Sequence, residues 1–88
     1  MRMSQGRFVG RTAVVLGGSG FVGSHLCEAL LGEGAQRVIS VDNLVTGNPG
    51  NLDGLRDRPG FEDLRHDITH PLSIEGAVDF VFNLASPA

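Results

Sequence analysis

The feature that most constrains the fold of this chain is a cluster of glycines at residues 17–23, which reads Gly-Gly-Ser-Gly-Phe-Val-Gly. An apolar, β-branched run, Thr-Ala-Val-Val-Leu, precedes it at residues 12–16. A short apolar run without polar alternation is typical of a strand buried on both faces of a parallel sheet. We therefore predict a strand over residues 12–16 that ends in a tight glycine turn.

Apolar residues after the glycines recur at three- and four-residue spacing, which places them on one face of a helix. They are Val22, Leu26, Ala29 and Leu30. Gly32 and Gly34 follow, and glycine is the usual residue just beyond a helix end. We predict a helix over about residues 21–31.

Three further runs predict strands, and they occupy residues 38–41, 61–66 and 79–84. The run at 61–66 has few apolar residues, which suits the edge of a sheet, and residues 43–60 predict at most a short helix at 52–55. Alternating strands and crossovers predict an α/β fold. We expect a Rossmann-type, doubly wound parallel sheet of strand order 3-2-1-4.

In that order the run at 79–84 would stand at an apolar edge, with no fifth strand to pair with it and no helix to cover it. A chain of 88 residues has room for one small domain only. We expect residues 1–88 to be the amino-terminal part of an NAD(P)-binding Rossmann domain, truncated after the fourth strand, without the rest of that domain and the substrate region.

The glycine cluster has the spacing of a dinucleotide-binding loop. Gly18, Gly20 and Gly23 form G-x-G-x-x-G, Gly17 also fits G-x-x-G-x-x-G, and Asp42 follows 22 residues after Gly20 at the end of the next strand. The first glycines open left-handed conformations, the missing Cβ at Gly20 lets a pyrophosphate approach, and Gly23 lets the helix pack close to the strand.

The chemistry of these residues favours NAD. The N–H groups of the first helical turn form an anion site, and the Asp42 carboxylate accepts hydrogen bonds from both ribose hydroxyls while repelling the 2′-phosphate of NADP. A merely structural glycine turn, a flavin dinucleotide site and an S-adenosylmethionine site are the alternatives. The last is disfavoured because Val15 and Leu16 stand where an acidic residue commonly precedes the loop.

Composition excludes several functions. All seven Lys or Arg positions are Arg, and Tyr and Trp are absent, so this chain holds no tyrosine or lysine acid/base. A net charge of −3 with dispersed arginines disfavours nucleic-acid and anionic-membrane partners. The single cysteine, Cys27, fits a reducing compartment, and no run is apolar enough for a leader or a membrane span, so we expect a cytoplasmic protein.

Four segments together carry a family resemblance. They are Leu-Gly-Gly-Ser-Gly-Phe-Val-Gly-Ser-His-Leu at 16–26, Val-Asp-Asn at 41–43 with Thr46-Gly47, Arg-His-Asp-Ile at 65–68 with Pro71-Leu72, and Leu-Ala-Ser-Pro-Ala at 84–88. The chain resembles the extended short-chain dehydrogenase/reductase family of NAD-dependent epimerases and dehydratases. Within it, the Arg-His-Asp segment and the Leu-Ala-Ser-Pro-Ala ending look most like the UDP-glucuronate decarboxylases, which make UDP-xylose.

The resemblance implies a set of cofactor contacts. The loop would contribute Gly17, Gly20, Phe21, Val22 and Gly23, with the middle three at the pyrophosphate. Asp42 and Asn43 would contact the adenosine ribose, and Thr46 and Gly47 would lie along the adenosine side.

Further positions follow from the same resemblance. Asp67 would accept from the adenine amino group beside Ile68, and Leu84 and Ser86 would approach the nicotinamide half. Leu72 and Ser73 would border the sugar nucleotide, although Ser73 stands where the family often has an aromatic residue. From the residues alone, a cap of a turn before Pro71 is the lesser alternative for Asp67, and Ser86 equally suits a turn before Pro87.

The resemblance also implies a reaction: oxidation of UDP-glucuronate at C4 by bound NAD, loss of carbon dioxide from the 4-keto acid, and return of the hydride to give UDP-xylose. The Tyr-x-x-x-Lys pair that performs it is absent here, so we expect no catalytic residues in this chain. The complete protein is expected to be a homodimer. Alternatives are a dTDP-glucose 4,6-dehydratase, a UDP-sugar 4-epimerase or a non-catalytic dinucleotide-binding module.

The remaining polar residues favour plainer interpretations. We expect His25 to be a surface or packing residue of the helix and Cys27 to be a small apolar helix residue. His66 and His70 flank Asp67, but this spacing lacks further ligands, so we expect no metal site.

Overall fold

The computed structural model describes residues 6–18, 20–42, 49–66 and 73–84. Their elements, in chain order, are β1 (Thr12–Leu16), α1 (Phe21–Gly32), β2 (Arg37–Asp42), the 3-10 helix η1 (Pro49–Leu52), β3 (Phe61–Arg65) and β4 (Phe80–Asn83). Strands and crossovers alternate as predicted, and each strand boundary differs from its predicted position by one residue at most.

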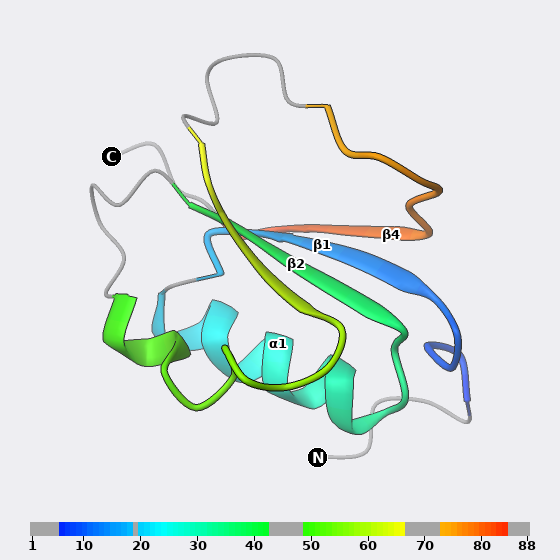
Figure 1. The fold of residues 1–88 in the computed structure, drawn as a ribbon, viewed down its shortest axis with the longest axis horizontal. Helices are drawn as coiled ribbons and strands as arrows, with labels where there is room; N and C mark the ends of the chain where they lie inside the picture. Colours follow the sequence, from blue (N-terminus) through cyan, green and yellow to red (C-terminus); the bar gives the residue numbers. More distant parts are fainter. Residues whose placement is uncertain (1–5, 19, 43–48, 67–72, 85–88) are drawn as a thin grey trace.

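The strands form one parallel sheet of order β3-β2-β1-β4, which confirms the predicted topology (Figure 1). Val14 of β1 pairs with Ile39 of β2 on one side and with Val81 of β4 on the other. Because the chain leaves β1 toward β2 and later returns to the opposite side of β1, the strand order reverses at β1. In such sheets the crevice at the carboxyl ends beside the reversal is the usual ligand site.

α1 and η1 cover one face of the sheet, and the segment before β4 lies on the other (Figure 1). The core under α1 is formed by Phe8, Ala13, Val15, Cys27, Leu30, Leu31, Val38, Leu52 and Leu55. The opposite face buries Val14, Ile39 and Val41, with Leu16 and Ile74 packed against them. β1 and β2 are therefore buried on both faces, as their unbroken apolar runs predict.

The buried face of α1 differs from the predicted one. Val22 is 65% exposed, whereas the residues that the helix buries are Gly23, Ser24, Cys27, Leu30 and Leu31. The prediction for Val22 was wrong because Gly23, without a side chain, is the residue that approaches the rest of the fold, and this turns Val22 outward. Leu26 packs at the margin of the core, so the face of α1 that is buried is turned about the helix axis relative to the predicted face but overlaps it.

α1 ends as its glycines predict, one residue later than expected. Glu33 is the C-cap, and Gly34 has φ +91°, a left-handed conformation that favours glycine. The Gly34 N–H donates to the Leu31 carbonyl at 3.1 Å and the Ala35 N–H to the Leu30 carbonyl at 3.0 Å. This pair of bonds is the Schellman motif, which directs the chain into β2.

The predicted short helix at residues 52–55 is a 3-10 helix that begins and ends earlier, at Pro49–Leu52. Its apolar anchors are nevertheless the expected ones, since Leu52 and Leu55 are 1% and 4% exposed. The two edge strands are much more exposed than β1 and β2, and Val81 in β4 is 62% exposed. The predicted edge position of the 61–66 strand is confirmed.

The turn before β1 carries a core residue that the sequence pattern did not indicate. Phe8 is 6% exposed, and its ring meets the ring of Phe80 edge-on, with centroids 4.9 Å apart. Gly10 N–H donates to the Gly34 carbonyl at 3.1 Å, which fixes this turn to the end of α1. Within the residues that the structure describes, no helix combines the length and the apolar character needed to cross a bilayer.

Candidate functional site

The glycine loop begins with a left-handed residue tied to the neighbouring strand. Gly17 has φ +87°, and its N–H donates to the carbonyl of Val41 at 2.7 Å. The Gly20 N–H then donates back to the Gly17 carbonyl at 3.2 Å, which closes the turn between β1 and α1. A side chain at residue 17 would be strained in this conformation, as the glycine pattern predicts.

Gly23 and Gly18 are glycines because the chain itself leaves no room for a side chain. A Cβ on Gly23 would lie 2.2 Å from the Gly17 carbonyl oxygen. The sequence predicts a close approach of the helix to the strand at Gly23, and in the structure this approach is to the loop that follows the strand. A Cβ on Gly18 would lie 2.0 Å from Oγ of Ser40. This contact between the loop and β2 was not predicted from the sequence. A polar residue within the otherwise apolar run Val-Ile-Ser-Val was its only signal.

Gly20 differs from these two. Its nearest neighbour beyond the adjoining residues is the Gly17 carbonyl oxygen, which an added Cβ would meet at 3.4 Å, an ordinary van der Waals contact. Packing within the described chain therefore tolerates a side chain at residue 20. Among the described residues beyond the adjoining ones, nothing lies closer than 3.4 Å to the place of a Cβ on Gly20, and this is the place where the sequence predicts a pyrophosphate.

The first turn of α1 is suited to an anion. Gly20 is the N-cap and makes no side-chain cap, and the first turn contains no acidic residue. The first intrahelical bond runs from the Ser24 N–H to the Gly20 carbonyl at 2.9 Å. The N–H groups of residues 21–23 precede it and have no intrahelical acceptor, so they present the positive end of the helix dipole. Phe21 and Val22 flank this turn with 73% and 65% of their surface exposed.

Asp42 ends β2 beside the loop. It follows Val41, whose carbonyl holds the Gly17 N–H, and its own carbonyl accepts the His66 N–H at 3.0 Å. The residue is 4% exposed. Because side chains alternate along a strand, Asp42 lies on the same sheet face as Ser40, the face that α1 covers. The structure thus brings the glycine loop and the predicted ribose ligand together at the carboxyl ends of β1 and β2, which is the edge of the sheet meant below.

Leu84 reaches the same edge from the other side of β1. Its N–H donates to the Leu16 carbonyl at 2.9 Å, and the residue is 41% exposed. The loop, Asp42 and Leu84 therefore line up across three adjacent strand ends, at the point where the strand order reverses. This is the order that a dinucleotide needs, with its adenosine half on the β2 side and its nicotinamide half on the β4 side.

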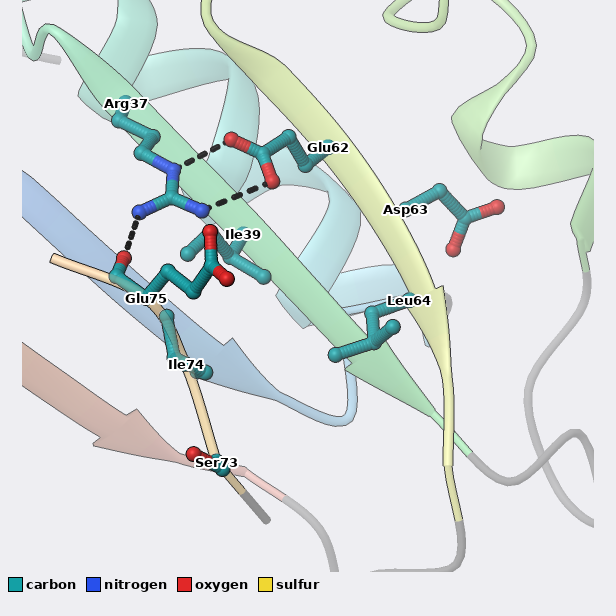
Figure 2. A pocket seen from close by; sticks show the side chains of 8 residues that line it. All are labelled: Arg37, Ile39, Glu62, Asp63, Leu64, Ser73, Ile74 and Glu75. Atoms are coloured by element: carbon teal, nitrogen blue, oxygen red, sulfur yellow. Dashed lines mark hydrogen bonds and ion pairs between the residues drawn. The ribbon is translucent and has the colours of Figure 1, made fainter.

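Ser73 lies on the face of the sheet opposite α1 (Figure 2), and its predicted contact with the sugar nucleotide stays a prediction. It lines a hollow of about 220 Å³ on the sheet face opposite α1, together with Arg37, Ile39, Glu62, Asp63, Leu64, Ile74 and Glu75 (Figure 2). Arg37 donates to both carboxylate oxygens of Glu62 and, at 2.5 Å, to the carbonyl of Glu75. The guanidinium of Arg37 lowers the pKa of the Glu62 carboxyl, and the carboxylate raises the pKa of Arg37.

A second hollow, of about 610 Å³, lies on the outer side of α1. It is lined by His25, Glu28, Ala29, Gly32, Glu33 and Arg58. The His25 ring meets Phe21 edge-on at 4.6 Å and is exposed, in agreement with a surface role. Neither hollow includes a residue of the glycine loop.

Cys27 is fully buried against the sheet. Burial, with a smaller contribution from the charge of Asp63, raises the pKa of its thiol to about 12. The thiol is therefore protonated and unreactive at neutral pH, as expected for a small core residue. In the described ranges no three His, Cys, Asp or Glu side chains gather as metal ligands, while His70 lies outside those ranges, so the absence of a metal site stays a prediction.

Seven predicted site residues lie outside the described residues. They are Asn43, Thr46, Gly47, Asp67, Ile68, Leu72 and Ser86. Their roles remain predictions.

Comparison with known proteins identifies the family. The family model described as "NAD dependent epimerase/dehydratase family" matches residues 13–88. UDP-glucuronic acid decarboxylase 1 of Arabidopsis thaliana is 49% identical over 75 residues, which cover 85% of this chain and 17% of that protein. The chain thus spans less than a fifth of the length of this relative.

Solved structures agree with this match. The Bordetella bronchiseptica enzyme WbmF in complex with NADH superposes with a TM-score of 0.82 at 32% identity, over 96% of this chain and 25% of WbmF. WbmF in complex with NAD+ and UDP gives 0.79 at 32% identity, over the same shares of the two chains. A family match over most of the chain, on a sheet of the same order, leads to one conclusion: the chain belongs to the NAD-dependent epimerase/dehydratase family.

Proposed function

We propose that residues 1–88 form the NAD-binding, amino-terminal part of a nucleotide-sugar enzyme of the UDP-glucuronate decarboxylase type. The observation that carries the proposal is the geometry at Gly20. Packing among the described residues leaves this position open, while Gly18 and Gly23 are closed by contacts within the chain. The 49% identity to a UDP-glucuronic acid decarboxylase supports the choice of enzyme within the family.

The residues present fit a dinucleotide. The N–H groups at the start of α1, which have no intrahelical acceptor, suit a pyrophosphate that approaches over Gly20, between Phe21 and Val22. The carboxylate of Asp42 suits the two hydroxyls of the adenosine ribose and disfavours a 2′-phosphate. Bound at this edge, NAD supplies the capacity to accept a hydride from the sugar and to return it.

The chain's own part in the reaction is to bind and orient. In the proposal Gly17 and Gly23 shape the loop, and Asn43, Thr46, Gly47, Asp67 and Ile68 surround the adenosine. Leu84 and Ser86 border the nicotinamide, and Leu72 and Ser73 border the sugar nucleotide. Because Tyr and Lys are absent from these 88 residues, the acid/base pair belongs to a part of the protein outside them. We further propose a cytoplasmic homodimer.

Product analysis tests the enzyme class. The protein in its full natural length is incubated with UDP-glucuronate and NAD, and the expected result is one carbon dioxide released for each UDP-xylose formed, without net reduction of NAD. A 4-epimerised or 4,6-dehydrated product from the corresponding UDP- or dTDP-sugar, without decarboxylation, would assign another member of the family. NAD binding without turnover of any sugar nucleotide would indicate a non-catalytic dinucleotide-binding module.

A further inference from the structure

The last residue of β3, Arg65, stands opposite Asp42 in the parallel register of β2 and β3. Register partners in a parallel sheet point to the same face, and adjacent strands lie about 4.8 Å apart. Arg65 and Asp42 therefore share the face that α1 covers, at the edge where the candidate site lies. The His66 N–H donates to the Asp42 carbonyl at 3.0 Å, which fixes the end of β3 to the end of β2.

Arg65 is exposed. Within the described ranges, no carboxylate lies within ion-pair distance of Arg65. The preceding acidic residue on the same face, Asp63, instead contacts Arg56 at 3.3 Å. Arg56 also pairs with Asp53 at 2.7 Å, so these three charges form a network of their own. Among the described residues Arg65 therefore has no ion-pair partner, and it stands one strand away from Asp42.

We propose that Arg65 is a second cofactor-specificity residue, which contacts the 2′-phosphate of NADP-type dinucleotides and opposes the preference for NAD that Asp42 sets. The inference rests on the proposed function, because it requires the adenosine ribose to lie at Asp42. A guanidinium presents several N–H donors in a planar fork that matches phosphate oxygens, and its reach exceeds the distance between two strands. Preference for NAD then depends on a balance of two charges on neighbouring strands.

Asp42 dominates that balance in the natural chain. It is 4% exposed, and a buried carboxylate repels a nearby phosphate through a less polar medium than water. Arg65 is exposed, so solvent and salt screen its attraction. When the Asp42 carboxylate is replaced by a neutral group, its repulsion is lost and the attraction of Arg65 remains. The site then accepts a 2′-phosphate.

Binding of NAD and NADP to four forms of the protein in its full natural length tests the proposal. The forms are the wild type, Asp42→Asn, Arg65→Gln and the double variant. Asp42→Asn preserves the shape of the buried side chain, and a thermal melt by circular dichroism verifies that each form is folded. Arg58→Gln is the matched control, since Arg58 is an exposed arginine before β3 that has no carboxylate within ion-pair distance among the described residues.

The expected result is that Asp42→Asn raises the ratio of NADP affinity to NAD affinity. In the double variant, with Arg65→Gln added, this ratio is expected to be about tenfold lower than in Asp42→Asn. Arg58→Gln leaves the ratio unchanged. Adenosine 2′,5′-bisphosphate, compared with ADP, reports the same difference from the adenosine end alone.

Two results would overturn the inference. One is a double variant that binds NADP as tightly as Asp42→Asn does. The other is a loss of NADP affinity from Arg58→Gln equal to that from Arg65→Gln, which would indicate only a general charge effect. If the wild-type protein binds no NAD, the proposed function fails and this inference fails with it. Wild-type NAD binding with no effect of Arg65 removes the inference alone.

Discussion

Gly18 and Ser40 stand in direct contact across the first two strands: a Cβ on Gly18 would lie 2.0 Å from Oγ and 2.6 Å from Cβ of Ser40. The glycine loop thus rests on β2 as well as connecting β1 to α1. Because Ser40 is fully buried, it has no space into which to retreat.

Gly18→Ala is therefore expected to destabilise the fold. The added methyl group must displace either the loop or β2, and overpacking of this kind costs about 1–3 kcal/mol. Chemical denaturation of the variant and the wild type measures the loss. Gly18→Ala combined with Ser40→Gly should regain part of it, because the nearest remaining atom would be the Ser40 Cα at 3.1 Å. A variant as stable as the wild type would contradict the contact.

Gly20→Ala should show the opposite behaviour. An added Cβ meets nothing closer than 3.4 Å, so we expect a loss of stability below about 1 kcal/mol, from the weaker N-cap. NAD affinity should nevertheless fall about tenfold or more, because the methyl group occupies the space over which the pyrophosphate approaches. Isothermal titration measures the affinity and a thermal melt the stability. Unchanged NAD binding by the folded variant would remove the pyrophosphate from this position.

Asp42→Ala should weaken NAD binding without abolishing it. The change removes the acceptor for two ribose hydroxyls, and hydrogen bonds to a charged group contribute roughly 1.5–3 kcal/mol each. We expect affinity for NAD to fall at least about tenfold, while affinity for inorganic pyrophosphate stays the same. If a folded variant gives the wild-type NAD titration, the ribose assignment is wrong.

Ser40→Ala is expected to leave the fold intact or to stabilise it slightly. The Ser40 Oγ is buried and has no hydrogen-bond partner among the residues that the structure describes. A buried hydroxyl without a partner costs about 1–3 kcal/mol, and its removal recovers part of that free energy. Urea denaturation at pH 7 provides the comparison. A marked loss of stability would show that this hydroxyl has a partner after all.

The Arg37–Glu62 pair should make the fold sensitive to acid. Arg37 lowers the pKa of Glu62 in the folded state, so the pair stabilises the fold above the unfolded pKa of about 4.3. That contribution disappears as the pH falls through the lower folded value. Melting temperatures of Glu62→Gln and the wild type should therefore differ at pH 7 and converge in acid. Glu28→Gln, on the exposed face of α1, is the control that should show no such convergence.

The strands, their order and Asp42 could be predicted from sequence because each depends on local pattern or on a general rule of parallel sheets. The buried face of α1 could be predicted only approximately, since the contact of Gly23 with Gly17 sets the rotation of the helix. Apolar spacing carries no information about that contact, because a glycine contributes no side chain to the pattern.

Contacts between particular side chains that are distant in sequence could not be predicted. Arg37 and Glu62 are 25 positions apart, and Gly18 meets Ser40 only once two strands have paired. Ser73 was grouped with the sugar nucleotide by resemblance, and the structure finds it on the face opposite α1, beside Ile74. The sequence alone does not show on which face of the sheet a residue in a connection between two strands, such as Ser73, will lie.

Phe8 bears on where this domain starts. The family model matches from residue 13 onward, yet the ring of Phe8 packs against Phe80 in the strand farthest from it along the chain. A recombinant form that begins at residue 13 would lose the five residues 8–12, which the fold uses. It would also uncover the rings of Phe80 and Phe82, which pack against the core that includes Phe8. The residues just before the family match are therefore part of what keeps the first and last strands together.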